Sequence, residues 1–201
     1  MLASANALPA LSEDELRQQR LVTDIIVGVI KDVSDSIVEA GLDPVIIDES
    51  DFSFALSEPE IFSAEGSVKD FKFYGLSNIA INRINFSILS TRLTFDISLP
   101  RIGLRVGSSS FAISTFGSEF EVKASGSVAV IQPRLVGDVR ASVGVISGIS
   151  IRSLSLSFSL GGIESDVELS LFDRDISAEV NDFLGNTVPN TLKENAVCKS
   201  F

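Results

Sequence analysis

The chain of 201 residues contains no histidine and no tryptophan, and only one cysteine, one methionine and one tyrosine. Without histidine, neither a Ser-His-Asp nor a Cys-His catalytic arrangement can form. The absence also excludes histidine-ligated zinc and the side chain most easily poised as a general base near neutral pH. Cys198 has no second cysteine in the chain, so we interpret it as a free thiol, with an intermolecular disulfide as the alternative. We therefore predict no catalytic residue, no metal site and no cofactor.

Positive charge is also scarce. The sequence has 16 Lys and Arg against 27 Asp and Glu, a net charge of −11. This balance argues against nucleic acid and against anionic membrane surfaces as partners. Carboxylate-only catalysis, as in glycosidases, needs two positioned acids. The acids here are scattered over polar strand faces and helix surfaces, so we predict that the protein is not an enzyme.

Long apolar runs are missing, and no stretch reaches the roughly 18 apolar residues of a membrane helix. The opening "MLASANALPA" lacks a basic start and a long apolar stretch, yet Ala3, Ala5 and Ala7 have the spacing seen around signal-peptidase sites. Asn85-Phe86-Ser87 is a glycosylation sequon. We expect residues 1–11 to be a leader or its remnant and residues 12–201 to be one domain. We also expect a secreted, extracellular protein with Asn85 as a candidate glycosylation site.

Two amphipathic helices are predicted, one near each end of the chain. Ser12 and Glu15 form a capping-box pattern, and apolar residues follow at helical spacing until Gly41 and Pro44, which predicts a helix over residues 12–40. A second apolar stripe predicts a helix over residues 175–188, which Pro189 kinks or ends. The stripes contain Val22, Ile25, Ile26, Val29, Ile30, Val33 and Ile37 in the first helix, and Ile176, Val180, Phe183, Leu184 and Val188 in the second.

Between the helices, residues 50–172 alternate between apolar and polar side chains, the period of a β-strand with one apolar face. The alternation slips near Asn82-Arg83, which predicts a β-bulge. Pro100 breaks a long run, and Ser108 to Ser110 are interpreted as a turn. Strands of this length predict a large, twisted antiparallel sheet whose apolar face must be covered.

Only the two helices are available as a cover. The predicted fold is therefore α+β: a long, curved antiparallel β-sheet wrapped around long N- and C-terminal helices, an elongated super-roll with both helices on the concave apolar face. The pattern alone leaves open whether side chains fill the space between helix and sheet. If they do not, an apolar tunnel of the kind that holds hydrophobic ligands runs through the roll.

The stretch "SLSLSFSL" at residues 153–160 is typical of one wall of such a space, because its even-numbered residues are all apolar. Each residue of the wall is also what a plain core would contain. Tyr74 could hydrogen-bond the polar end of a ligand or simply end a strand. Our candidate ligand-contacting residues are Val29, Val33, Phe71, Phe73, Phe86, Phe95, Leu154, Leu156, Phe158, Leu160, Val180 and Phe183.

The order of helix, long meander and helix resembles the TULIP superfamily, whose arthropod members include juvenile-hormone-binding proteins, takeout proteins and group 7 mite allergens. The likeness is carried by "LVTDIIVGVIKDVSDSIVEAGLDPV", "GSVKDFKFYGLSNIAINRINFSI", "LTFDISLPRIGL" and "DISAEVNDFLGNTVPNTLKE". The resemblance implies a super-roll that carries a hydrophobic molecule in a tunnel. Takeout and juvenile-hormone-binding proteins usually have an N-terminal disulfide, and this chain has no cysteine before Cys198. In that respect it is more similar to the mite allergens, and juvenile hormone itself is in doubt.

Two functions follow as hypotheses. The first is non-enzymatic binding and transport of a hydrophobic small molecule such as a terpenoid, a carotenoid or another lipid. With no Arg or His expected inside, the tunnel should prefer a neutral, elongated molecule over a charged fatty acid. The alternative is a structural or interaction protein with a filled core and no ligand, in which the broad serine-rich faces pack on a second subunit to form a dimer.

Overall fold

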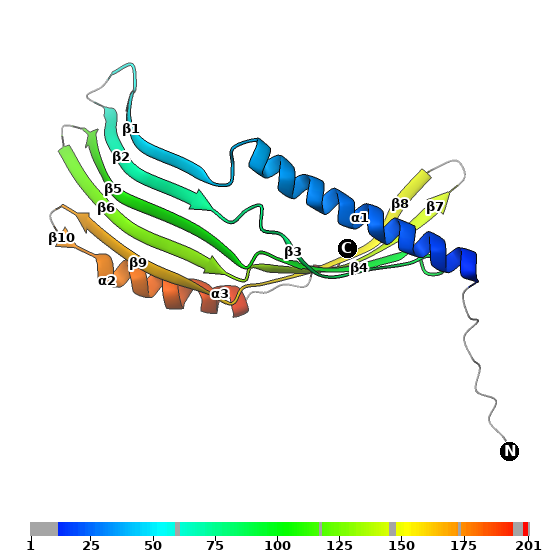
Figure 1. The fold of residues 1–201 in the computed structure, drawn as a ribbon. Helices are drawn as coiled ribbons and strands as arrows, with labels where there is room; N and C mark the ends of the chain where they lie inside the picture. Colours follow the sequence, from blue (N-terminus) through cyan, green and yellow to red (C-terminus); the bar gives the residue numbers. More distant parts are fainter. Residues whose placement is uncertain are drawn as a thin grey trace.

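The computed structural model describes residues 12–58, 61–116, 118–144, 148–172, 174–194 and 199–200. The expected leader at residues 1–11 and the thiol of Cys198 lie outside the described residues. Helices frame a long run of strands (Figure 1), as predicted. The helical segments are α1 (Glu13–Glu39), α2 (Ser177–Asp182), the π-helical turn η1 (Phe183–Thr187) and α3 (Val188–Glu194). The strands are β1 (Val45–Ala55), β2 (Phe62–Tyr74), β3 (Ala80–Ser87), β4 (Arg92–Ser98), β5 (Arg101–Thr115), β6 (Ser118–Ile131), β7 (Arg134–Gly144), β8 (Gly148–Ser159), β9 (Gly162–Leu171), β10 (Arg174–Asp175) and β11 (Lys199–Ser200).

The strands form two antiparallel sheets that meet end to end. Sheet A has the order β1-β2-β5-β6-β9-β10, and sheet B has the order β11-β8-β7-β4-β3. Both curve along the length of the molecule (Figure 1). The fold is therefore α+β, a long curved antiparallel sheet with helices at its two ends in sequence, which confirms the predicted class.

Prolines set the line where the two sheets meet. β4 runs into β5 through Pro100, and β6 runs into β7 through Pro133. Proline has no N–H to give to a ladder, so each of these long strands is interrupted there. The N–H of Leu99 donates to the Pro133 carbonyl at 3.0 Å, and the N–H of Gln132 donates to the Pro100 carbonyl at 3.1 Å. The predicted break at Pro100 is confirmed as a boundary between sheets.

Two predictions about strand irregularities had different outcomes. The pairing of β3 with β4 shifts register between Ile81 and Arg83, which confirms the bulge predicted at Asn82-Arg83. The predicted turn at Ser108–Ser110 is wrong, because these residues lie inside β5. The register of β5 against β6 shifts between Val106 and Ser109, so the polar run marks a bulge within a continuing strand.

The start and end of α1 are fixed by local side chains. The Ser12 hydroxyl accepts from the Glu15 N–H at 3.3 Å, and the Glu15 carboxylate accepts from the Ser12 N–H at 2.8 Å, so the predicted capping box is present. Beyond the helix, Asp43 is buried and accepts hydrogen bonds from the Gly75 N–H at 2.8 Å and from the Ser77 N–H and hydroxyl, both at 2.6 Å. Asp43 therefore ties the α1–β1 connection to the β2–β3 connection.

The C-terminal helix does not stop at Pro189. A π-helical turn, η1, precedes the proline, and α3 continues to Glu194. The extra residue in this turn accommodates a position that lacks an N–H, as π-turns in helices commonly do. The helix predicted over residues 175–188 is therefore present, but it begins two residues later, at Ser177 after β10, and extends beyond its predicted end.

The two helical regions lie over different sheets. α1 packs mainly against β3 of sheet B, whereas α2, η1 and α3 lie along β9 of sheet A (Figure 1). The expectation that both cover one apolar face together is thus not met. Both helices have an apolar stripe, but a stripe does not specify which strand a helix packs against. That choice depends on contacts between elements that are far apart in sequence.

Asn181 of α2 covers the open edge of β9. Its Nδ2 donates to the Val167 carbonyl at 2.8 Å and its Oδ1 accepts from the Val167 N–H at 3.0 Å, so one side chain replaces a neighbouring strand. Closing an unpaired strand edge in this way also blocks pairing with another chain.

Replacing Asn181 by alanine should lower the free energy of unfolding by about 1–3 kcal/mol, because both backbone groups of Val167 lose their partner. Urea titration measures this as a lower midpoint with an unchanged slope. Asn186→Ala is the matched control, since Asn186 donates only to Asp182 one turn earlier on an exposed surface. Equal urea midpoints for the two variants would show that the Asn181 hydrogen bonds to Val167 do not stabilise the fold.

Candidate functional site

One face of sheet B is apolar at every paired position across its four main strands. Phe95 of β4 pairs with Ile84 of β3 and with Gly137 of β7, and Gly137 pairs with Leu156 of β8. Directly paired residues share a face of an antiparallel sheet. The face consists of Ile81, Ile84, Phe86, Leu93, Phe95, Ile97, Leu135, Gly137, Val139, Leu154, Leu156 and Phe158.

Gly137 makes room for Phe95 at the middle of this face. A Cβ at position 137 would lie 2.1 Å from the Cζ of Phe95 and 2.3 Å from its Cε1, far inside van der Waals contact. The Phe95 ring therefore lies across the backbone of β7. A glycine inside a strand pattern is typical of such a close approach.

The predicted wall residues of sheet B come together. Phe86, Phe95, Leu154, Leu156 and Phe158 all lie on the apolar face, and Phe158 is 44% exposed at one end of it. Leu160 follows the end of β8, at the junction of the two sheets, and is half-buried. These side chains form one contiguous apolar surface on sheet B.

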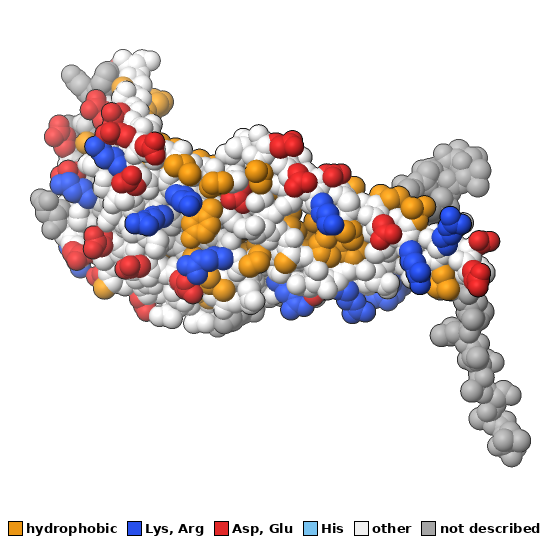
Figure 2. All heavy atoms as spheres, in the orientation of Figure 1, with side chains coloured by type: hydrophobic (Ala, Val, Ile, Leu, Met, Phe, Trp, Pro, Cys, Tyr) orange, Lys and Arg blue, Asp and Glu red, His pale blue; other side chains and the backbone are white. Residues whose placement is uncertain are grey.

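The apolar stripe of α1 is covered along one edge only. Val22, Ile26 and Ile30 are half-buried, whereas Val29 and Val33 remain 55% and 48% exposed. Figure 2 shows hydrophobic side chains along the side of α1 that borders the strands. Part of the apolar surface of α1 thus remains exposed after α1 packs against the sheet.

Many large hydrophobic side chains among the described residues remain exposed. Leu21, Ile25 and Ile151 are 60%, 57% and 67% exposed, whereas the small side chain of Ala129 is buried at 4%. Much apolar surface is therefore open in the described part of the chain, and contiguous apolar surface is typical of sites for ligands or partners.

The remaining predicted residues lie on other parts of the fold. Phe71 and Phe73 of β2 are half-buried and pair with Ile47 and Val45 of β1 in sheet A. Val180 and Phe183 belong to the helices along β9, where Phe183 is 55% exposed. The structure does not bring Val180 and Phe183 to the sheet B face.

Sheet A has an aromatic cluster of its own. Phe52 and Phe111 contact each other with ring centroids 5.5 Å apart, and both rings lie against Gly66, which pairs with both residues. Tyr74 is paired with Gly103, and its ring lies against that glycine and 5.5 Å from the Lys72 ammonium. Tyr74 thus packs within sheet A and does not lie on the apolar face of sheet B.

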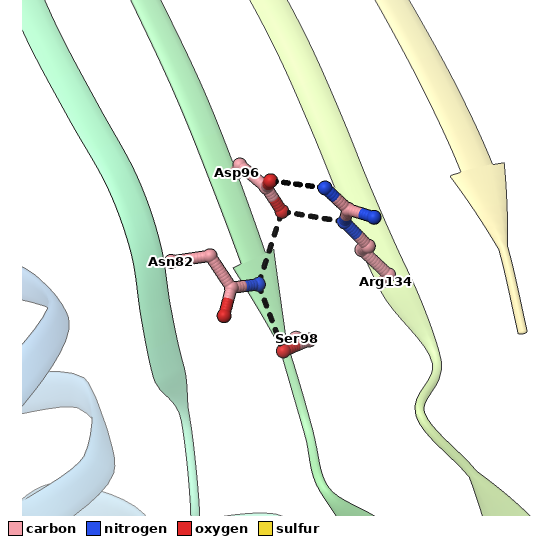
Figure 3. Close-up of polar contacts among 4 residues, drawn as sticks. All are labelled: Asn82, Asp96, Ser98 and Arg134. Carbon is pink, nitrogen blue, oxygen red and sulfur yellow. Dashed lines mark hydrogen bonds and ion pairs between the residues drawn. The ribbon is translucent and has the colours of Figure 1, made fainter. Parts of the chain in front are cut away.

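The opposite face of sheet B is polar. Asp96 accepts hydrogen bonds from Arg134 Nε at 2.8 Å and from Asn82 Nδ2 at 3.0 Å, and Asn82 also contacts Ser98 (Figure 3). The Arg134 and Asn82 hydrogen bonds lower the pKa of Asp96 to about 2. The ion pair of Arg134 with Asp96 and the hydrogen bonds of Asn82 therefore lie on the face opposite the apolar one.

Two structural residues escaped the sequence predictions, Gly137 and Asp43. A glycine interrupting "RLVGDV" is a signal of close backbone approach, and an acid flanked by Leu42 and Pro44 is a signal of a buried acceptor. Within the described ranges, no group of His, Cys, Asp or Glu is placed to hold a metal ion. No helix among those residues is long and apolar enough to cross a membrane.

Among curated proteins, no sequence matches the chain. The structure is similar to Takeout 1 of Epiphyas postvittana, with 14% identity over 77% of this chain and 70% of that chain and a TM-score of 0.39. It is also similar to lipopolysaccharide binding protein, with 10% identity over 87% of this chain and 37% of that chain and a TM-score of 0.27. The profile of the haemolymph juvenile hormone binding protein family matches residues 22–197, and the chain belongs to this family.

Proposed function

We propose that the protein binds a hydrophobic small molecule on the apolar face of sheet B, beside α1, and carries it without chemical change. The observation that supports this most is the unbroken apolar register from β3 to β8 together with the exposed half of the α1 stripe. Membership of a family named for binding juvenile hormone supports the same class of ligand. The family name also supports secretion into an extracellular fluid.

The chemistry of the face favours a neutral, elongated ligand such as a terpenoid or a carotenoid. Every position at which β3, β4, β7 and β8 pair with one another on this face is aliphatic, aromatic or glycine, so dispersion and release of water would supply most of the affinity. A carboxylate placed among these positions would lose its hydration without gaining a partner there. A fatty acid would therefore have to leave its head group at an edge of the face, such as the edge where Lys199 of β11 pairs with Leu156.

Organic extraction of the purified full chain followed by mass spectrometry tests the proposal directly. We expect a lipophilic molecule in the extract, or binding when the extracted protein is titrated with a neutral polyene. Weaker binding of a fatty acid of similar length would support the neutral preference. If no molecule is extracted and neither ligand binds, the alternative of an interaction protein that uses its faces for partners or self-assembly is correct.

Phe158→Ala should weaken polyene binding about 5- to 30-fold. The half-exposed ring contributes about 1–2 kcal/mol of apolar contact to a ligand on this face. Fluorescence or absorbance titration measures the dissociation constant. Phe116→Ala is the matched control, since Phe116 is 83% exposed at the β5–β6 connection, away from sheet B. Equal losses in the two variants would place the ligand elsewhere.

A further inference from the structure

We propose that Asn85 carries an N-linked glycan whose first sugars lie in a hollow on the polar face of sheet B. The proposal depends on passage through the secretory pathway and is independent of what the apolar face binds. The sequence contains one Asn-X-Ser/Thr sequon, Asn85-Phe86-Ser87, and it lies within β3.

The pleat of β3 presents this sequon to solvent. Asn85 pairs with Thr94 and Phe86 pairs with Leu93, so the phenylalanine points to the apolar face while Asn85 points to the polar one. Asn85 is exposed. β3 is the last strand of sheet B on its side, and its main contact with α1 leaves Asn85 and Arg83 uncovered. An attached sugar would therefore leave both the apolar face and the hydrogen-bond ladder intact.

The side-chain amide of Asn85 forms no hydrogen bond among the described residues, whereas those of three other asparagines do. Asn82 donates from Nδ2 to Asp96 and Ser98, Asn181 donates to Val167, and Asn186 donates to Asp182. Within the part of the chain that the structure describes, Asn85 Nδ2 has no hydrogen-bond partner. It is the atom that a glycan would occupy, and modification there breaks no existing contact.

The surroundings of Asn85 suit a saccharide. Asn85 lines a hollow of about 780 Å³ together with Arg83, Ser87, Arg92, Thr94 and Ser90. Hydroxyl and guanidinium groups are donors and acceptors that match sugar hydroxyls. Asp138 accepts from Arg92 Nε at 2.6 Å, whereas no hydrogen bond or ion pair engages the Arg83 guanidinium within the described residues, although its charge helps to lower the pKa of Asp96. The sequon and the hollow are thus adjacent on one face.

The chemistry is a glycosyl transfer from an oligosaccharide linked to a lipid pyrophosphate. A bond forms between Asn85 Nδ2 and C1 of the first sugar, and the bond from C1 to the pyrophosphate oxygen breaks. The lipid pyrophosphate leaves with the electron pair, and Nδ2 gives up one proton. The Ser87 hydroxyl supplies the third position of the sequon that the transfer requires.

Translation of the full chain behind a signal sequence in the presence of microsomes, with protease protection to score entry into the lumen, tests the modification. We expect the protected chain to gain the mass of one N-linked oligosaccharide, which a peptide-N-glycosidase removes and leaves aspartate at position 85. Asn85→Gln and Ser87→Ala should abolish the gain, while Ser90→Ala, in the same hollow but outside the sequon, should keep it. A protected chain without added mass overturns the proposal.

The place of the glycan is tested with an arginine-directed dicarbonyl reagent and peptide mass spectrometry. Arg83 should react severalfold more slowly in the glycosylated protein than in Asn85→Gln, whereas Arg105, which lies on sheet A, should react equally in both. Equal reactivity of Arg83 in the two forms would place the sugars in open solvent and refute the docked position while leaving the modification established.

Discussion

Gly137→Val is expected to weaken ligand binding by roughly 10- to 100-fold and to lower the free energy of unfolding by about 1–3 kcal/mol. The new Cβ would lie 2.1 Å from the Cζ of Phe95, so the ring must leave its place on β7. Valine is otherwise favoured over glycine inside a strand. Strand propensity alone therefore predicts the opposite sign for stability, which makes the result diagnostic. Urea unfolding and polyene titration measure the two effects.

The double variant Gly137→Val, Phe95→Ala separates the clash from any other effect of valine. Once the ring is absent, valine at position 137 should cost much less stability than it does beside Phe95, a coupling of the size seen between residues in contact. Phe95→Ala alone should weaken binding because it removes ring surface from the centre of the face. If valine lowers the free energy of unfolding equally with and without the Phe95 ring, then the ring does not lie across Gly137.

Local patterns in the sequence predicted the elements well. The capping box of Ser12 and Glu15, the bulge at Asn82-Arg83 and the break at Pro100 each depend on neighbouring residues in the chain, and all three are confirmed. The alternation from Leu154 to Phe158 likewise predicted which side chains share a face. Because side chains alternate between the two faces of a strand, the face of one residue determines the face of all the others until a bulge intervenes.

Non-local packing accounts for the errors. Both helices were expected to cover one apolar face because both carry an apolar stripe. The helix that contains Val180 instead lies along β9, where Asn181 holds it. An apolar stripe indicates that one side of a helix is buried, but it does not indicate which strand the helix packs against. The run Ser108–Ser110 resembles a turn in composition, but its neighbours pair on both sides within β5. A turn-like composition therefore predicts a turn only for a segment that does not pair with neighbouring strands.

The sequence pattern could not predict how exposed the apolar surfaces are. Alternation predicts an apolar face whether or not side chains fill the space in front of it. Only the folded structure shows that Val29 and Val33 stay about half exposed and that Gly137 leaves room for the Phe95 ring. A filled core and an exposed apolar face thus have the same sequence signature in this architecture.

Asp43→Ala is expected to lower the free energy of unfolding by about 3 kcal/mol at pH 7. The substitution removes one carboxylate that accepts from the Gly75 N–H and from both donors of Ser77. Ser77 in turn accepts the Ser34 hydroxyl of α1 through its carbonyl, so the loss also loosens the attachment of α1 beside the apolar face. Polyene binding should therefore weaken together with stability. Asp48→Ala is the matched control, since Asp48 is exposed on β1 and should change stability by less than about 0.5 kcal/mol.

The dependence of this effect on pH follows from the pKa of Asp43. Burial disfavours the charged carboxylate, but the hydrogen bonds from Ser77 and Gly75 outweigh burial and lower the pKa of Asp43 below its ordinary value. The stabilisation is therefore fully present above the unfolded-state pKa of about 3.9 and is lost as the pH falls through the lower folded-state pKa. The difference in unfolding free energy between wild type and Asp43→Ala should be constant from pH 7 to pH 5 and should narrow below pH 4. A difference that instead widens on acidification would mean that the Asp43 side chain is held in its neutral form, and that the connection between α1 and sheet A is fastened by other groups.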